Sequence, residues 1–231
     1  MSFSGTGELR AGAPASIWTA AGRARAPATG ADACRLLDVA LAIAALALLW
    51  PLMLLIAVGI KVQDGGPILF AHRRVGRGGK AFLCWKFRSM VEGAEARLPA
   101  LLSRDPVAQA EWAADHKLRR DPRVTHLGRL LRSTSMDELP QLLNVLVGDM
   151  SLVGPRPIVP AEVERYGRWF RHYAALRPGI TGLWQVSGRN DINYRRRIAL
   201  DVLYARRRTT ALYLGILGAT APAVAWRHGS Y

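Results

Sequence analysis

The feature that most constrains this chain is one long apolar run, from Leu36 to Ile60. A helix of this length is sufficient to cross the hydrocarbon core of a bilayer, which takes about 20 apolar residues. Asp38 is the only charged residue in the run, and it lies close to one end. We therefore expect a membrane protein in which this segment is the membrane element.

Two features argue against a simple crossing. Pro51 lies inside the run, where proline removes a backbone hydrogen bond and clashes with the preceding turn, so a kink is expected. Both flanks are basic, and the positive-inside rule would place both ends in the cytoplasm. The flanking cations are Arg23, Arg25 and Arg35 before the run and Lys61, Arg73, Arg74 and Arg77 after it. On these residues alone, a kinked spanning helix and a hairpin that dips into one leaflet both remain open.

The rest of the chain divides around this segment. Residues 1–34 are rich in Ala, Gly, Pro and Arg with little periodic pattern, which predicts a disordered basic tail. Residues 35–62 are the membrane element, and residues 63–231 are long enough for one sizeable domain. We expect this domain to be α+β and mostly helical, with a small β-hairpin and interfacial amphipathic helices.

The net charge of +15 over 231 residues indicates a polyanionic partner. Nucleic acid, an anionic membrane face and phosphorylated substrates would each satisfy it. Seven Trp residues and the apolar run favour the membrane. No RNP, zinc or basic-zipper pattern supports nucleic acid.

Secondary structure in the domain is signalled by turn residues and by apolar periodicity. Residues 68–70 and 81–85 are typical of strands, joined by a glycine-rich turn at 76–79. The segment 211–226 is apolar but contains Pro222, so we expect an interfacial helix with Tyr213 and Trp226 at the headgroups. Further helices are expected over 91–118 (interrupted by Pro99 and Pro106), 127–131, 139–147, 161–176 and 192–208.

The chemistry is predicted at Asp137 and Glu138, which precede the apolar segment 139–147 and so lie near a helix N-terminus. Unpaired N–H groups and the helix dipole favour anions there, including phosphates. A carboxylate held ionised at that place can bind Mg²⁺ or attack phosphorus as a nucleophile. The plainer alternative is a capping box, because Ser135-x-x-Glu138 has that pattern. Adjacent helical residues also diverge, so the two carboxylates would not converge by default.

Several cations accompany this acidic pair in the sequence, namely Lys86, Arg88, Arg132 and Arg156. Pro155 and Pro157 hold Arg156 on a stiff backbone, which suits a guanidinium that presents two donors to a phosphate. Lys86 and Arg88 end a predicted strand close together, where they could hold a diphosphate. Each cation alone is readily explained as solvated surface charge, and only their convergence on the acidic pair favours a phosphate site.

Three blocks of the sequence carry a family resemblance: KFRSM at 86–90, RSTSMDELPQLLNVLVGDMSLVGPRP at 132–157, and RPGITGLWQVSGRND at 177–191. They resemble the signature blocks of the bacterial sugar transferases, the small monotopic polyprenyl-phosphate hexose-1-phosphate transferases of exopolysaccharide and glycan assembly. The apolar run with Pro51, DGGPILF at 64–70 and RRVGRGGK at 73–80 follow the expected order. The resemblance covers about residues 35–231.

The resemblance implies a re-entrant membrane hairpin broken at Pro51, a monotopic protein of the bacterial inner membrane, and an active site on the cytoplasmic face. The implied reaction joins a UDP-sugar and undecaprenyl phosphate to give polyprenyl-diphosphate-sugar and UMP, with Mg²⁺ as cofactor. Asp137 would attack the phosphorus next to the sugar and leave a phosphosugar–enzyme intermediate, which the lipid phosphate resolves. Glu138 would assist in metal binding or orientation. Anionic lipids and a second copy of the chain are further expected partners, and nucleic acid is not.

The resemblance also implies a substrate-binding set, comprising Lys86, Arg88, Arg132, Pro155, Arg156, Pro157, Gln185, Arg189 and Asp201. Asp201 and Tyr204 match a D-x-x-Y pattern of the family. Two departures stand out, because Trp50 replaces the serine that often precedes the hinge proline, and residues 205–210 replace an aromatic stretch with a basic one. The SGRND block resembles members that use UDP-glucose or UDP-galactose. The alternative to an enzyme is a basic, membrane-attached nucleic-acid-binding or scaffold protein.

Overall fold

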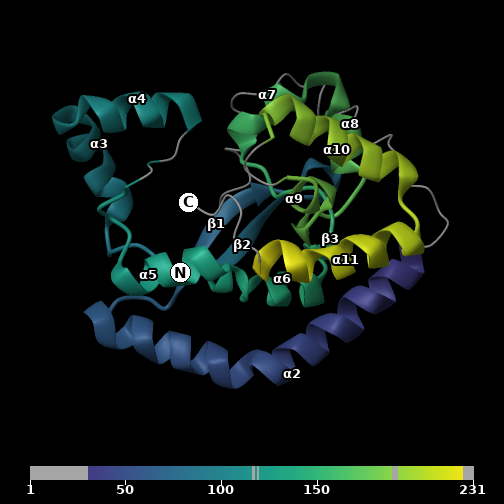
Figure 1. The fold of residues 1–231 in the computed structure, drawn as a ribbon, viewed down its shortest axis with the longest axis horizontal. Helices are drawn as coiled ribbons and strands as arrows, with labels where there is room; N and C mark the ends of the chain where they lie inside the picture. Colours follow the sequence, from purple (N-terminus) through teal and green to yellow (C-terminus); the bar gives the residue numbers. More distant parts are fainter. Residues whose placement is uncertain (1–30, 116–117, 119, 189–191, 226–231) are drawn as a thin grey trace. The chain divides into compact units, whose positions relative to one another are not determined.

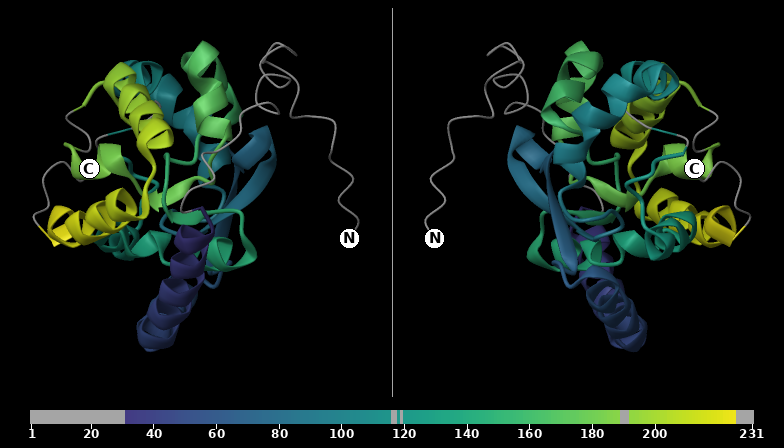
Figure 2. Two further views of the ribbon diagram at one scale, coloured as in Figure 1. Left: turned by 90° about the vertical axis from the view of Figure 1, so that its right-hand side faces the viewer. Right: turned by 90° about the vertical axis from the view of Figure 1, so that its left-hand side faces the viewer.

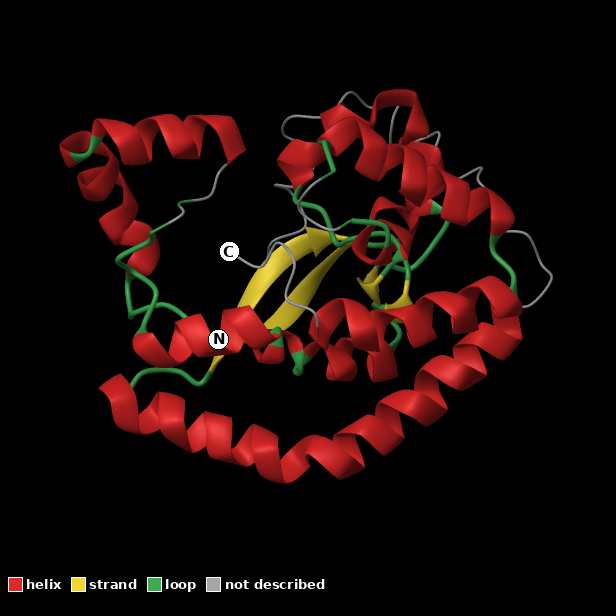
Figure 3. Ribbon diagram, viewed as in Figure 1, coloured by secondary structure: helices red, strands yellow, loops and turns green. Residues whose placement is uncertain are grey.

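The structure is a computed structural model that describes residues 31–115, 118, 120–188 and 192–225. Figures 1 and 3 show helices with two small sheets, which confirms the predicted mostly helical α+β class. The described residues form two compact units. The larger unit comprises the described parts of 31–49, 71–85 and 140–225, and the smaller unit those of 50–70 and 86–139. Most of the predicted basic tail lies outside the described residues.

The apolar run folds as a single helix, α2 (Ala31–Asp64), which contains Pro51. A proline removes only one backbone N–H donor, so the turns on either side of it can keep their hydrogen bonds. The break expected at Pro51 is therefore not an interruption of the helix, and the re-entrant topology stays a prediction. By length and composition, α2 is the one helix in the described part of the chain that could cross a membrane.

Most apolar side chains of α2 are not covered by the protein. Leu48 is 77% exposed, Trp50 60% and Leu55 69%. Exposed apolar surface on this scale marks an interaction with lipid or another protein. The side chains of α2 that are buried lie at the start of the helix, at Cys34 and Asp38, and at scattered later positions.

The smaller unit packs around the second half of α2. Its core joins Ile56 and Ile60 of α2 to Phe87 and Leu131. Helix α5 (His126–Thr134) begins at Thr125, whose hydroxyl accepts a hydrogen bond from the backbone N–H of Gly128 at 2.8 Å. The predicted helical region 91–118 is divided into α3 (Ala94–Arg104) and α4 (Pro106–Asp115), and Pro106 begins the second helix.

Strands β1 (Leu69–Val75) and β2 (Ala81–Phe87) pair in one two-stranded sheet, as predicted, although both run further than 68–70 and 81–85. They are joined by the 3₁₀ turn η2 (Arg77–Gly79). Gly78 has φ 70°, in the left-handed region that favours glycine, which explains the glycine-rich turn.

Strands β3 (Ser151–Val153) and β4 (Gly179–Thr181) form a second sheet that the sequence did not predict. They are parallel, with Ser151 opposite Gly179 and Val153 opposite Thr181. Three-residue strands are too short to show a period-two pattern, which is why they were missed. The pairing extends one residue past β3, because the N–H of Gly154 donates to the carbonyl of Thr181 at 2.9 Å.

Six helices complete the larger unit within the described residues, and helix α11 packs against β3 and β4 (Figure 2). The predicted helix 161–176 is wrong as one element, because Gly167 (φ 48°, ψ −129°) divides it. Two short 3₁₀ turns, η4 (Pro160–Glu162) and η5 (Gly167–Trp169), flank its first piece. The six helices are α6 (Gln141–Val147), α7 (Val163–Tyr166), α8 (Phe170–Ala174), α9 (Leu183–Val186), α10 (Tyr194–Arg207) and α11 (Thr210–Ala225).

Tyr213 corrects the prediction of an interfacial residue at the headgroups. Its side chain is fully buried, and its hydroxyl donates to Oδ1 of Asp38 at 2.8 Å. Asp38 Oδ1 also accepts from Ser151 Oγ at 2.9 Å and from the N–H of Leu152 at 2.8 Å. The single charge of the apolar run therefore fastens the start of α2 to β3 and α11. Trp226, the other predicted headgroup residue, lies outside the described residues.

Candidate active site

The predicted site residues are distributed over both units. The smaller unit contains Lys86, Arg88, Arg132, Asp137 and Glu138. The larger unit contains Pro155, Arg156, Pro157, Gln185 and Asp201. Arg189 lies outside the described residues.

The acidic pair lies on the 3₁₀ turn η3 (Met136–Glu138), directly after α5. Ser135 ends α5 with φ 58°, a conformation that is uncommon for a residue other than glycine. Ser135 makes no side-chain capping bond, so the capping box that would have explained Glu138 is not formed. The sharp turn at Ser135 instead sets the direction in which Asp137 and Glu138 leave the helix.

Both carboxylates converge on the ammonium of Lys86, at the end of β2. Lys86 Nζ donates to Oε1 of Glu138 at 2.6 Å and lies 3.5 Å from Oδ2 of Asp137. Adjacent residues of a regular helix would point apart. The 3₁₀ turn and the shared cation bring these two carboxylates together, which the sequence alone did not predict.

Asp137 is the more deeply buried of the two acids, with 10% of its side chain exposed against 32% for Glu138. Burial raises the pKa of Asp137 above its ordinary value, and the neighbouring charge of Glu138 acts in the same direction. The positive charges of Lys86 and Arg132 oppose that rise. Arg132 is held beside the pair by its Nε, which donates to Ser89 Oγ at 2.8 Å. The result is a desolvated carboxylate of raised basicity next to two cations.

The acidic pair also fits the chemistry of Mg²⁺. This ion prefers carboxylate oxygens, and in phosphate-handling sites it is held by one or two carboxylates together with substrate phosphates and water. Asp137 and Glu138 supply that many carboxylates. Among the described residues there is no group of three or more His, Cys, Asp or Glu close enough to hold a metal. A metal here would therefore depend on oxygens from the substrate.

Arg88 is two residues from Lys86 but has different partners. Its guanidinium forms two hydrogen bonds to the carboxylate of Asp64, one of them 2.6 Å long, and its Nε donates to the carbonyl of Pro67 at 2.5 Å. The side chain is buried, with 8% exposed. The structure thus gives Arg88 the role of fastening the end of α2 to the turn that follows it.

In the larger unit, the Pro155-Arg156-Pro157 turn directly follows β3. The carbonyl of Pro157 accepts from the guanidinium of Arg74 at 3.2 Å. The Arg156 guanidinium lies over the ring of Trp184, 5.8 Å from its centroid. Such a contact holds a guanidinium in a fixed plane while it keeps its hydrogen-bond donors.

Asp201 lies in the core of the larger unit, on α10. Its side chain is 3% exposed, and its Oδ2 accepts from the hydroxyl of Tyr166 at 2.7 Å. Burial raises the pKa of Asp201 to about 7, against the hydrogen bond from Tyr166 and the charges of Arg197 and Arg156. Tyr204, the second residue of the D-x-x-Y pattern, is buried and donates to the carbonyl of Val153 at 3.3 Å. Both residues of this pattern are therefore fixed by packing.

Around Trp184 the structure shows unpaired polar atoms on Gln185, which belongs to the predicted substrate-binding set, and on Trp184 and Arg197, which the sequence did not single out. Arg197 also lies over the Trp184 ring, 5.5 Å from its centroid, and its guanidinium donates to Glu162 at 3.1 Å. The Nε2 of Gln185 donates to Ile180 O at 3.0 Å. Within the described residues, Trp184 Nε1, Gln185 Oε1 and Arg197 Nε are buried without a hydrogen-bond partner. Buried atoms of this kind call for a partner such as water or a bound molecule. The contact of Arg197 with Glu162 joins residues 35 apart in the chain, so no local sequence signal marks it.

The fold and the acidic pair together define a class: a small α+β protein with one exposed apolar helix and a buried carboxylate site suited to a phosphate substrate. A family described as bacterial sugar transferase matches residues 31–227, and the chain belongs to that family.

Three relatives illustrate the match. The chain is 50% identical over 197 residues to an undecaprenyl-phosphate galactose phosphotransferase of Salmonella typhimurium, covering 85% of this chain and 41% of the relative. It is 47% identical over 197 residues to the exopolysaccharide production protein ExoY of Sinorhizobium fredii, covering 85% and 87%. It is 39% identical over 202 residues to a UDP-glucose:undecaprenyl-phosphate glucose-1-phosphate transferase of Xanthomonas campestris, covering 84% and 39%. The chain thus spans less than half of two relatives and most of the third.

Proposed function

We propose that this protein transfers hexose-1-phosphate from a UDP-hexose to undecaprenyl phosphate and releases UMP. The membership of the bacterial sugar transferase family supports this reaction class. We propose that the sugar is a hexose, because the names of relatives that match 84% or more of this chain include galactose and glucose. The observation that carries the proposal is the buried carboxylate of Asp137, next to Glu138 and to the shared cation Lys86.

In the first step, a carboxylate oxygen of Asp137 attacks the phosphorus that is bonded to the sugar. The bond between that phosphorus and the UMP oxygen breaks, and UMP leaves with the electron pair. Burial favours this attack because a desolvated carboxylate of raised pKa is a better nucleophile than a solvated one. The product is an acyl phosphate, in which the carboxyl group of Asp137 carries the phosphosugar.

In the second step, a phosphate oxygen of undecaprenyl phosphate attacks the same phosphorus. The bond to Asp137 breaks, which restores the carboxylate and gives undecaprenyl-diphosphate-hexose. Atoms and charges balance without any further reactant. Lys86 and Arg132 lie where positive charge would offset the negative charge on the reacting phosphate.

Glu138 positions Lys86 through their 2.6 Å hydrogen bond. Asp137 and Glu138 would also hold Mg²⁺, with its remaining ligands from the substrate diphosphate and water. When bound, this ion supplies positive charge that stabilises the departing UMP phosphate.

The reaction is tested by measuring UMP release from UDP-glucose and from UDP-galactose, with the full chain in detergent and undecaprenyl phosphate as acceptor. We expect release to need acceptor and divalent cation for full turnover, and Asp137→Asn to abolish it. Glu95→Gln is the matched control, because Glu95 is an exposed acid on α3 of the same unit. Full turnover by Asp137→Asn would remove Asp137 as nucleophile, and no release with any UDP-hexose would overturn the reaction.

The covalent step has its own test. Without acceptor, the enzyme and UDP-hexose should yield UMP equal to the amount of enzyme, and intact-mass measurement should show a hexose-phosphate adduct. Peptide mapping should place the adduct on Asp137. An unmodified enzyme that still turns over with acceptor present would replace the two-step route with direct transfer.

We further propose that α2 enters and leaves the membrane on the cytoplasmic side. The exposed apolar side chains of α2 and the basic residues at both of its ends support this topology. In a background with Cys34 and Cys84 replaced, Ala33→Cys and Gln63→Cys introduce thiols at exposed positions near the two ends. An impermeant maleimide should label both only after spheroplasts are lysed. Labelling of one of them in intact spheroplasts would show a spanning helix instead.

A further inference from the structure

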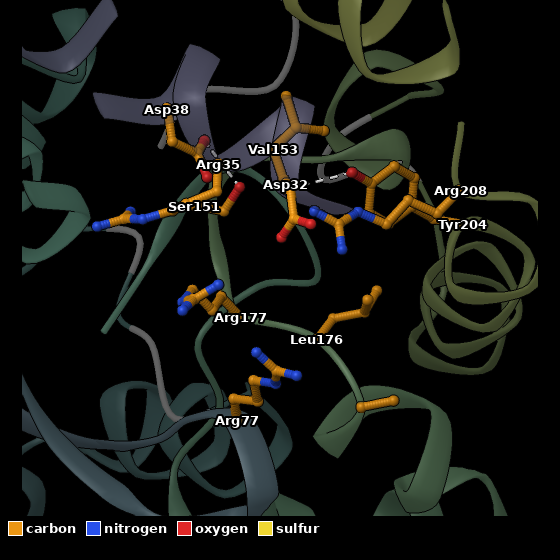
Figure 4. Close-up of a pocket in the computed structure, with 11 residues that line it drawn as sticks. Asp32, Arg35, Asp38, Arg77, Ser151, Val153, Leu176, Arg177, Tyr204 and Arg208 are labelled. Atoms are coloured by element: carbon orange, nitrogen blue, oxygen red, sulfur yellow. Dashed lines mark hydrogen bonds between the residues drawn. The ribbon is translucent and has the colours of Figure 1, made fainter. Parts of the chain in front are cut away.

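The larger unit contains a cavity of about 210 Å³ that takes no part in the proposed reaction. Four arginines line it, Arg35, Arg77, Arg177 and Arg208, together with two aspartates, Asp32 and Asp38. They come from the start of α2, the turn η2, the segment before β4 and the end of α10. Figure 4 shows these side chains around the cavity, with the guanidinium groups of Arg77 and Arg177 close to each other.

The cavity holds more positive than negative charge. Asp38 is already engaged by three neutral donors on its Oδ1, from Ser151, Leu152 and Tyr213. Arg35 donates to the carbonyls of Val145 and Leu146 at 2.7 and 3.0 Å.

The other arginines add to this excess. Arg177 donates to the carbonyl of Gly148 at 2.7 Å. In the part of the chain that the structure describes, none of the four arginines forms an ion pair with a carboxylate within 4.0 Å. Carbonyl groups thus hold Arg35 and Arg177 in place, and the four arginines outnumber the two aspartates of the cavity.

The guanidinium groups repel one another. Burial lowers the pKa of Arg177, and the positive charges of Arg35, Arg77 and Arg208 lower it further, with Asp38 opposing. Like charges gathered around one cavity are costly unless an anion joins them. Arginine is the side chain best suited to a phosphate, because its fork of donors matches two phosphate oxygens.

The size of the cavity restricts the ligand. Pockets for whole drug-sized ligands hold about 300–1,000 Å³. A cavity of about 210 Å³ suits a phosphate or a small phosphorylated headgroup rather than a nucleotide sugar. It is thereby a different kind of site from one that would bind the UDP-hexose donor.

The position of the cavity indicates which kind of molecule would carry the phosphate. Asp32, Arg35 and Asp38 lie on the first turns of α2. Apolar side chains between these residues and after them are exposed. Leu36 is 72% exposed and Ile43 55%. Cations at the end of an exposed apolar helix are placed at the level of lipid headgroups when that helix enters a membrane.

We propose that this cavity binds the phosphate group of an anionic membrane lipid, whose acyl chains lie along the first turns of α2. The proposal rests on the proposed membrane attachment of α2 and not on the transfer reaction. Such a site would fix the depth of α2 in the leaflet, because Arg35 and Asp38 belong both to the cavity and to the helix.

The test uses the full chain in neutral detergent and monomeric short-chain phosphatidylglycerol as probe, without UDP-hexose. Binding is measured by native mass spectrometry and by the shift in unfolding temperature. Inorganic phosphate and short-chain phosphatidylcholine are tested in parallel. We expect phosphatidylglycerol to bind and to raise the unfolding temperature, and the other two to do so much more weakly.

Arg77→Gln and Arg208→Gln remove one cavity charge each, and Arg195→Gln is the matched control because Arg195 is exposed on α10 and does not line the cavity. Each cavity variant should bind phosphatidylglycerol about tenfold more weakly, the loss of one charge-assisted hydrogen bond, while the control binds as wild type. Equal weakening in all three variants would show general charge attraction and overturn the site. Inorganic phosphate that binds as tightly as the lipid would overturn the lipid as ligand.

Folding of the variants is checked by their unfolding transition without lipid. Arg77 lies exposed on the turn η2, so its replacement leaves the packed core untouched. If Arg208→Gln does not fold, Arg77→Lys provides the second variant. It keeps the charge but loses the fork of donors, so it should bind the lipid more weakly than wild type. UMP release is measured separately and reports on the transfer reaction alone. A loss of lipid binding with normal UMP release, or the reverse, therefore shows which of the two proposals has failed.

Discussion

Asp137 and Asp201 are two buried aspartates with raised pKa values, and they differ in the groups that contact their carboxylates. Asp137 lies on a 3₁₀ turn of the smaller unit beside the charged groups of Lys86, Arg132 and Glu138. Asp201 lies on a helix of the larger unit, and its hydrogen bond comes from the neutral hydroxyl of Tyr166. Burial is the largest cause of the rise in both.

A raised pKa therefore does not by itself mark a buried carboxylate as reactive. Both carboxylates have two cations nearby, but Asp137 lies 3.5 Å from the ammonium of Lys86, whereas the hydrogen bond to Asp201 comes from a neutral hydroxyl. Asp137 also lies on a turn, and Asp201 inside a helix. The two cations of the KFRSM block, Lys86 and Arg88, also differ in the groups that they contact. Lys86 meets the acidic pair and Arg88 meets Asp64, although they are two residues apart.

The largest expected effect comes from Asp137→Asn. Removing the proposed nucleophile should lower turnover by at least about a thousandfold, since the proposed covalent route is then closed. Stability at neutral pH should not fall, because the variant no longer buries a carboxylate whose pKa is raised. UMP release and thermal unfolding in the same detergent measure both quantities. A variant that loses turnover because it unfolds early would leave Asp137 a packing residue like Asp201.

Lys86→Met should have the next largest effect. Lys86 lowers the pKa of Asp137, so its removal should move the acidic limb of the kcat/KM profile to higher pH. Turnover at neutral pH should drop by about ten- to a hundredfold. Lys80→Met, at an exposed lysine of the η2 turn, is the control. An acidic limb that stays in place would show that Lys86 does not act on the titrating group.

Arg88→Gln should act on stability. It removes the guanidinium that holds Asp64 and the carbonyl of Pro67, and should lower the free energy of unfolding by about 2 kcal/mol. The KM for UDP-hexose should stay at the wild-type value in the folded protein. A raised KM with unchanged unfolding temperature would instead return Arg88 to the phosphate-binding set.

Asp201→Asn should have the smallest effect on turnover, and it should change mainly the pH dependence of stability. The pKa of Asp201 is about 7 in the folded protein, above its ordinary value of 3.8, so between these pH values the folded state binds the proton more tightly. Stability from this group is therefore present at low pH and lost as the pH rises through about 7. The loss is about 1 kcal/mol per pH unit within that window.

The measurement is thermal unfolding of wild type and Asp201→Asn at pH 5, 6, 7 and 8. The asparagine can still accept the hydrogen bond from Tyr166, so the variant should fold and should lack this part of the slope. Parallel curves for the two proteins would show that Asp201 does not titrate in this range.

The sequence alone determined the apolar helix, the mostly helical α+β class and the family, because a long apolar run and collinear motif blocks are local signals. It also located Asp137 and Glu138 as the acidic pair. It could not show how they would be arranged, since the capping pattern at Ser135 predicts a different geometry from the turn that forms.

Only the tertiary structure decided the partners of each side chain. It directed Lys86 rather than Arg88 to the acidic pair, buried Tyr213 against Asp38, and formed the β3–β4 sheet from two three-residue strands. It also gathered four arginines from separate segments around one cavity. Charge and hydropathy patterns report what a residue is, whereas its partner is set by packing between segments that are far apart in the chain, and no local pattern encodes that packing.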